Sequence, residues 1–146
     1  MIKNFLARCR FERSPFDLIT KGNKGGNPMK YVLLIYLEEN ALSETEREDC
    51  YVKSAQLAQQ LNSKGQYLAT APLHPIATAT SIRVRDGKPL VTDGPFAETR
   101  EQLGGFFLID AQDLDAAIAI AAQIPAAQVG TVEIRPVIEV AGLPEY

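Results

Sequence analysis

The sequence predicts an α+β domain, in which an antiparallel sheet carries two helices on one of its faces. Two segments, at residues 43–64 and 113–124, have helix caps and apolar residues at three- and four-residue spacing. Short β-prone runs precede, separate and follow these segments. An Asp-Gly dipeptide at residues 86–87, between two short β-prone runs, indicates an additional hairpin.

The chain after residue 28 begins with a strand and a long helix. Residues 30–37 form a nearly continuous β-prone run, which is typical of a central strand covered on both faces. Ser43 and Glu46 have the spacing of a capping box, so we expect a helix to begin near Ser43. Gly65 is expected to stop this helix. Its buried stripe is predicted to consist of Val52, Leu57, Ala58 and Leu61.

The middle of the chain is predicted to contain a short strand, a loop and a hairpin. Residues 66–69 are the strand, and two prolines make residues 71–77 a loop. Residues 79–85 alternate between apolar and basic side chains, as a strand with two different faces does. The dipeptide at 86–87 is the turn, and residues 90–92 return antiparallel.

The last part of the chain is predicted to form a strand, a second helix and a final strand. The strands are expected at residues 105–109 and 131–137. Asp113 is expected to open the helix and Pro125 to end it. The buried side of this helix is predicted to consist of Leu114, Ala117, Ile118, Ala121 and Ile124.

Without the hairpin at residues 80–92, the order of the elements is β-α-β-β-α-β, which is the ferredoxin-like plan. Both helices then cover the same face of the sheet. The strands at 31–37 and 105–109 are apolar on both sides, so the uncovered face would be a large apolar patch. We therefore expect a homodimer that buries this open sheet face.

Composition and charge exclude several classes of protein. A chain of 146 residues with 46% apolar and 23% charged residues is expected to form one globular domain. No apolar run approaches the roughly 20 residues of a membrane span. Residues 29–146 carry nine basic and sixteen acidic residues, and this net charge of −7 argues against nucleic-acid binding. The two cysteines, Cys9 and Cys50, have no metal or disulfide spacing, so we expect a cytoplasmic location.

Residues 1–28 differ in charge from the rest of the chain. They carry six basic and two acidic residues, and they end in a stretch rich in Gly, Asn and Lys. We expect Met29 to be the natural start of a domain at 29–146, with 1–28 a disordered basic leader. A genuine N-terminal extension that binds a partner is the alternative.

Residues 93–99, Asp-Gly-Pro-Phe-Ala-Glu-Thr, resemble the signature of the DGPF proteins, a branch of the YCII-related superfamily. The similarity extends upstream through residues 78–88 and downstream through 103–109, and it covers residues 29–137. The resemblance implies a ferredoxin-like fold and a dimeric α/β barrel-like assembly. It implies little about activity, because most members of the family have no assigned reaction.

Asp93 is the first candidate site residue, with two interpretations. As a turn residue it would accept backbone N–H groups, while Gly94 supplies an unusual φ angle. As a site residue it would present a carboxylate at the mouth of a cleft, as a base or a ligand anchor. Arg83 and Arg85 share one strand face and suit a carboxylate or phosphate, although a solvated face explains them equally. Glu98 is either a solvated loop residue or the partner of these arginines.

His74 is the only histidine and lies between two prolines. It is either an exposed loop residue or a catalyst paired with Asp93, because histidine alone titrates near neutrality. One histidine without a cysteine cluster does not predict a metal site, and no cofactor motif occurs. Some enzymes of the wider superfamily use a His–Asp pair whose histidine lies on the first helix. Residues 43–64 contain no histidine, so that role does not transfer to this chain.

The functional expectation combines the fold, the resemblance and the candidate residues. We expect a cleft near Asp93 that binds a small polar or aromatic molecule, with a weak hydrolase or lyase activity as an open question. The alternative is a non-enzymatic regulatory protein, because DGPF proteins are often encoded beside extracytoplasmic-function sigma factors.

Overall fold

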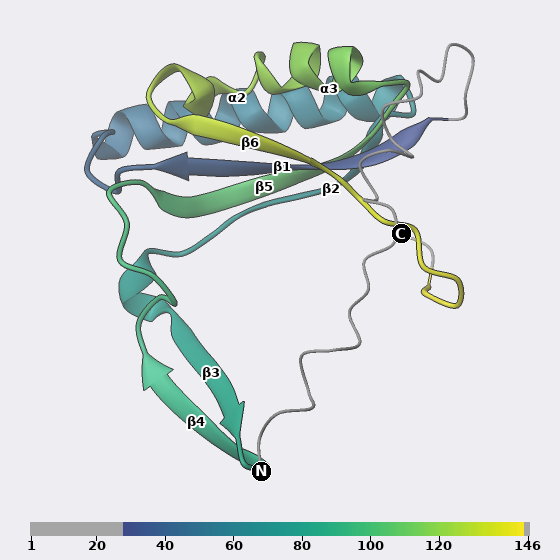
Figure 1. Ribbon diagram of the computed structural model, residues 1–146. Helices are drawn as coiled ribbons and strands as arrows, with labels where there is room; N and C mark the ends of the chain where they lie inside the picture. Colours follow the sequence, from purple (N-terminus) through teal and green to yellow (C-terminus); the bar gives the residue numbers. More distant parts are fainter. Residues whose placement is uncertain (1–27, 145–146) are drawn as a thin grey trace.

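In the computed structural model of the chain, residues 28–144 are described. The predicted leader at residues 1–28 therefore lies outside this part of the chain, except for Pro28. A four-stranded antiparallel sheet forms the centre, with the strand order β2-β5-β1-β6 (Figure 1). Its strands are β1 (Met29–Leu37), β2 (Tyr67–Pro72), β5 (Gln102–Ala111) and β6 (Thr131–Pro136). The arrangement is consistent with the predicted ferredoxin-like α+β fold.

Two helices, α2 (Glu44–Ser63) and α3 (Leu114–Ala121), lie on one face of this sheet (Figure 1). The predicted capping box is confirmed, because the Ser43 N–H donates to Glu46 Oε2 at 2.8 Å and the Glu46 N–H donates to Ser43 Oγ. Asp113 caps α3 by accepting the Ala116 N–H at 2.8 Å. Such caps satisfy N–H groups that a helix leaves unpaired at its start.

The core lies between the sheet and the helices. Alternate residues of the two central strands point into it, and the helices contribute their buried sides. Its members include Tyr31, Leu33, Ile35, Phe107, Ile109, Leu57, Leu61, Ala117, Ile120 and Ile124. Among the described residues, none of the buried ones is charged or polar. No helix within residues 28–144 is long and apolar enough to span a membrane.

Some predicted helix details are wrong. Val52 is exposed, because it lies five residues before Leu57 and is therefore rotated by roughly 140° around the axis. Leu114 and Ile118 are also exposed, whereas the predicted Ala117 and Ala121 are buried. The helix buries Ile120 in addition, so its buried stripe is shifted around the axis toward Ile120. The helix ends at Ala121, earlier than predicted, because the ring of Pro125 would clash with the carbonyl of that residue. Pro125 begins the 3₁₀ turn η2 (Pro125–Gln128).

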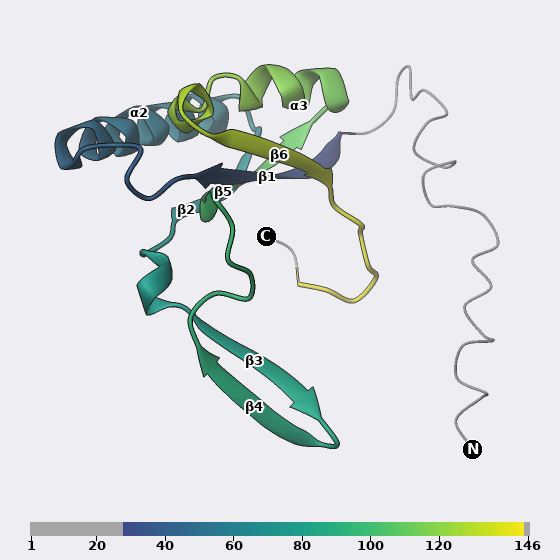
Figure 2. The same ribbon diagram turned by 60° about the vertical axis from the view of Figure 1, so that its left-hand side comes forward.

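The sheet face opposite the helices carries apolar side chains at its centre. In the register of the two central strands, Val32 pairs with Leu108 and Leu34 with Phe106. Leu108 is buried and the other three are half-buried. The face is bordered on β6 by Glu133 and Arg135, whose side chains lie 3.7 Å apart. Figures 1 and 2 show that neither α2 nor α3 covers this face.

A separate hairpin, here called the arm (residues 80–93), extends away from the sheet on the side opposite the helices (Figure 2). It consists of β3 (Thr80–Arg85) and β4 (Lys88–Asp93), preceded by the 3₁₀ turn η1 (Ile76–Thr78). Asp86 and Gly87 have φ angles of 50° and 73°, so the two-residue turn is confirmed and is of the I′ type.

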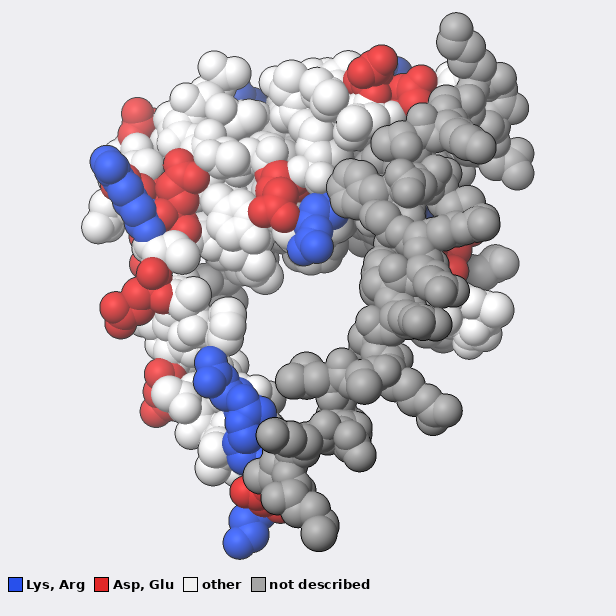
Figure 3. Space-filling view, in the orientation of Figure 1, with Lys and Arg blue, Asp and Glu red and all other residues white. Residues whose placement is uncertain are grey.

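The arm has one apolar and one basic face. Ile82 pairs with Val91 across the two strands, and each side chain is 64% exposed. Arg83 pairs with Leu90 and Arg85 with Lys88 on the opposite face. In the space-filling view, basic side chains run along the arm (Figure 3). An isolated two-stranded hairpin is only marginally stable in water, so its apolar face needs a covering surface.

Candidate functional site

Asp93 lies at the end of β4, with its side chain exposed. The turn that follows is held by other groups: the Gly94 N–H donates to Ala79 O at 2.8 Å, and Ser81 Oγ donates to Gly94 O at 2.8 Å. Gly94 has a φ of 108°, which only glycine adopts readily. Within the described residues the Asp93 carboxylate accepts no hydrogen bond, so capping of this turn does not explain it.

Within the described part of the chain, no ion pair or hydrogen bond joins the other predicted residues of this region to one another. The guanidinium of Arg83 lies 5.4 Å from the ring centroid of Phe96, which is a cation–π arrangement. Arg85 donates to the carbonyl of Val84 at 3.2 Å. Glu98 is exposed, and in the described part of the chain it forms no ion pair with either arginine. Whether these residues bind a ligand stays a prediction.

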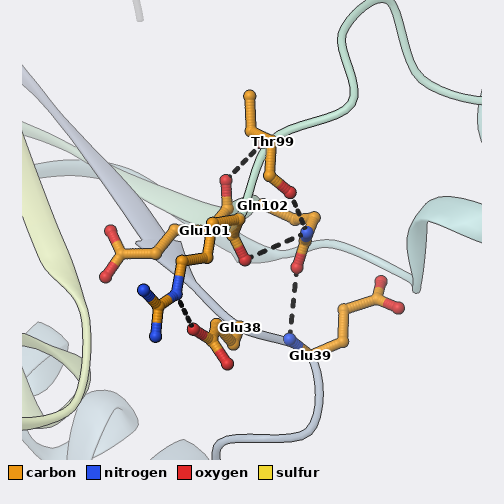
Figure 4. Close-up of polar contacts among 6 residues, drawn as sticks. Glu38, Glu39, Thr99, Glu101 and Gln102 are labelled. Atoms are coloured by element: carbon orange, nitrogen blue, oxygen red, sulfur yellow. Dashed lines mark hydrogen bonds and ion pairs between the residues drawn. The ribbon is translucent and has the colours of Figure 1, made fainter.

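The chain returning from the arm is tied to the end of β1 (Figure 4). The Arg100 guanidinium forms an ion pair with Glu38 at 2.7 Å. The side chain of Gln102 accepts the Glu39 N–H at 3.2 Å and donates to the carbonyls of Thr99 and Arg100. This segment is therefore fixed to the sheet at the place where β5 begins.

The loop after β2, which contains His74, is fixed to the same edge of the sheet. The Leu73 N–H donates to Gly104 O at 2.9 Å, and the Ile76 N–H donates to the carboxylate of Glu39 at 2.6 Å. His74 lies between these two attachments, with its side chain exposed. It is at the rim of a cavity, here called the α2 cavity.

The α2 cavity has a volume of about 200 Å³ and lies between α2, the end of β1, the end of β2 and the start of β5. Most of its wall is apolar and includes Ile35, Leu37, Leu42, Ala71, Leu73 and Phe107. Its polar lining residues are Glu39, Arg47, Cys50, Tyr51, Ser54, Thr70, His74 and Gln102. Of the predicted site residues, His74 alone lines this cavity.

The cavity exists because small residues face each other across the helix–sheet interface. Ser54 and Cys50 lie one and two turns, respectively, before the buried Leu57, on the same side of α2. They leave space where larger apolar side chains would fill the core. Opposite them lies Gly105, where a Cβ would be 2.8 Å from Ala71 O, so that no side chain fits there.

Arg47 contributes the positive charge of the cavity. Its side chain is half-buried, and Nη2 donates to the backbone carbonyl of Glu39 at 2.6 Å. No carboxylate among the described residues forms an ion pair with it. In contrast, Arg100 and Lys53 both pair with carboxylates. Sequence reasoning missed Arg47, although its three- and seven-residue spacing to Cys50 and Ser54 marks a common helix face.

Cys50 lies in the wall of the cavity. Burial raises the pKa of its thiol, and the hydrogen bond with Ser54 only partly offsets this effect. The thiolate is the reactive form, so the folded protein presents Cys50 mainly as an inert thiol near neutral pH.

We expect alkylation of Cys50 by iodoacetamide at pH 7.5 to be at least about tenfold slower in the folded protein than in urea, because burial limits both thiolate formation and access. The measurement is the rate of mass increase in a Cys9→Ser variant, in which Cys50 is the single cysteine. The rate should rise further with pH above the unfolded pKa of about 8.5.

The raised pKa of Cys50 also determines how the stability of the folded protein changes with pH. A folded pKa above the unfolded value means that the Cys50 contribution is present below the unfolded pKa and is lost as pH rises through the folded pKa. A Cys50→Ala variant should therefore lose less stability than its Cys50-containing parent between pH 7 and pH 10. Equal alkylation rates in the folded and unfolded states would contradict the burial of this thiol.

Comparison with known proteins agrees with this architecture. The model of the YCII-related domain matches residues 29–141. The chain belongs to the YCII-related family. An uncharacterized protein of Rhizobium meliloti (strain 1021) is 36% identical over 113 residues, which cover 74% of this chain and 91% of that protein. In the described part of this YCII-related chain, no group of three or more His, Cys, Asp or Glu residues is placed to hold a metal ion.

Proposed function

We propose that this YCII-related protein is a homodimer that binds a small, largely apolar molecule in the α2 cavity. The observation that carries the proposal is an apolar cavity of about 200 Å³ with a few polar groups on its wall. An engineered apolar cavity of about 150 Å³ accepts benzene. Pockets for drug-sized ligands have roughly 300–1,000 Å³. The cavity therefore suits a molecule of about one ring.

The proposed dimer is supported by two apolar surfaces on the same side of the molecule. The centre of the open sheet face is apolar, and the arm lies on the same side of the sheet as this face (Figure 1). The arm exposes Ile82 and Val91. A second copy would cover both surfaces with the same two surfaces of its own, as a twofold interface requires. Burial of apolar area is the main driving force for such association.

Within this proposal, the predicted cleft around Asp93 is a second possible site for the ligand. On a single chain the Asp93 carboxylate is exposed and has no opposing wall, so a cleft there requires the second copy. A hydrolase or lyase reaction at Asp93 and an association with a sigma-factor system both stay predictions.

A thermal-shift screen of small aromatic and branched aliphatic compounds tests the proposed binding. A ligand at about 100 times its Kd adds roughly 2.7 kcal/mol to the stability of the native state, which raises the Tm by several degrees. A Ser54→Phe variant, in which the new ring occupies the cavity, should lose this shift. The matched control is Gln59→Phe on the exposed surface of the same helix, which should keep it.

Two results would contradict the proposed binding site. One is the absence of any stabilising compound in a screen that includes single-ring acids, alcohols and amides. The other is an unchanged shift in the folded Ser54→Phe variant, which would place the compound elsewhere.

A further inference from the structure

The charge distribution in the α2 cavity specifies the chemistry of its occupant, given the proposed function. Arg47 is the half-buried guanidinium of the cavity wall, and among the described residues it uses one hydrogen bond, to the Glu39 carbonyl at 2.6 Å. A guanidinium has five N–H donors in a planar fork. A charge that is partly removed from water without an opposite charge is costly, and a ligand that supplies one recovers that cost.

The carboxylate in the wall belongs to Glu39, and its position decides where an anion can bind. Its carboxylate accepts the Ile76 N–H at 2.6 Å, and it forms no ion pair with Arg47. The backbone of Glu39, and not its carboxylate, is what Arg47 contacts. Glu39 therefore disfavours an anion at the loop side of the cavity, whereas Arg47 favours one at the α2 side.

The remaining wall provides an apolar environment for the body of the ligand. Ile35, Leu37 and Phe107 come from the sheet, and Leu42 and Leu73 come from the adjoining loops. Thr70 is already committed, because its hydroxyl donates to Phe106 O at 2.7 Å. Besides the guanidinium, the wall offers the exposed side chains of Tyr51 and His74, and of these three Arg47 carries the permanent positive charge.

We propose that the α2 cavity binds a small carboxylate with an apolar body of about one ring, and that Arg47 holds the carboxylate through paired N–H···O bonds. Arg–carboxylate pairs are frequently bidentate, and charge-assisted hydrogen bonds are about twice as strong as neutral ones. The proposal adds a ligand class and a specificity-determining residue to the proposed function.

The test compares benzoate with benzyl alcohol, which has a similar ring and size but no charge, by isothermal titration on the full-length protein. Benzoate should bind at least about tenfold more tightly than benzyl alcohol. Arg47→Met removes the charge but keeps an unbranched side chain, and it should abolish this preference, because it weakens benzoate binding far more than benzyl alcohol binding. Arg47→Lys keeps the charge without the planar fork and should give an intermediate preference.

The location is tested with Cys50 as a reporter in the Cys9→Ser background. Saturating benzoate should slow alkylation of Cys50 severalfold, because both groups occupy the same cavity. Benzoate that binds without protecting Cys50 lies elsewhere and overturns the proposal. A melting curve of Arg47→Met confirms that the variant is folded before its affinities are compared.

The outcomes separate this inference from the proposed function. Equal affinities of benzoate and benzyl alcohol, both lost in Ser54→Phe, would keep the cavity as a binding site and overturn the role of Arg47. A preference for benzoate that persists in folded Arg47→Met would overturn it as well. If neither probe binds the wild-type protein, the proposed carboxylate ligand is overturned. The wider compound screen then decides whether the cavity binds a ligand at all.

Discussion

A chain in which Ile82 and Val91 are both replaced by glutamate is expected to be monomeric at concentrations where the wild-type protein is dimeric. The two residues are cross-strand partners on the arm, and each is 64% exposed in a single chain. In the proposed dimer they would be buried. Desolvating an unpaired carboxylate costs several kcal/mol, so the dimer Kd should rise by at least about a hundredfold.

Sedimentation velocity over a range of protein concentrations measures this change. The control places the same two charges on the outer side of α2, as Gln56→Glu with Gln59→Glu, where both positions are exposed. This control should sediment as the wild-type protein does, with twice the mass of one chain. A wild-type protein that is monomeric at micromolar concentration would rule out the dimer, and a variant that stays dimeric would remove the arm from the interface.

Gly130→Ala is expected to cause a large loss of stability. A Cβ at this position would lie 2.1 Å from Tyr36 O and 2.9 Å from Leu37 Cβ, so the backbone of β6 would have to move away from β1. Overpacking typically costs about 1–3 kcal/mol, and a clash with backbone atoms is expected at the upper end of this range. The Tm should fall by on the order of 10 °C, as measured by circular dichroism.

Gly104→Ala is the matched control for this substitution. There an added Cβ would lie 2.7 Å from Leu37 Cδ2, which is the end of a flexible side chain that can rotate away. We expect a clearly smaller loss of stability than for Gly130→Ala. Equal effects of the two substitutions would show that contact with backbone is not what makes Gly130 necessary.

Local sequence patterns predicted much of the fold because each pattern reports on its immediate neighbours. The capping box at Ser43 and the positive φ of Gly65 depend on a few adjacent residues, and both are confirmed. The turn at 86–87 is confirmed for the same reason. Where the prediction of α3 failed, two alternative apolar stripes were present in an alanine-rich segment, and packing against the sheet selected one of them.

The α2 cavity was not predictable in the same way. Its walls come from four separate stretches of the chain, and it depends on what is missing from them: bulk at Cys50 and Ser54, and any side chain at Gly105. A polar residue on a helix is usually solvated, so the helix face that Arg47 shares with Cys50 and Ser54 did not by itself indicate a site. The tetrapeptide at residues 93–96, which is conspicuous in the sequence, begins at the end of the arm and not in the cavity wall.

The loop that forms the mouth of the α2 cavity is also the segment from which the arm starts. Leu73, His74 and Pro75 line the cavity, and β3 begins at Thr80 after one short 3₁₀ turn. In the proposed dimer, a second copy that fixes the arm would also restrict the shape of the mouth. Thermodynamic reciprocity then applies: the factor by which the ligand tightens the dimer equals the factor by which dimerisation tightens ligand binding. The concentration of the protein, which sets the fraction that is dimeric, would thereby determine its apparent affinity for the ligand.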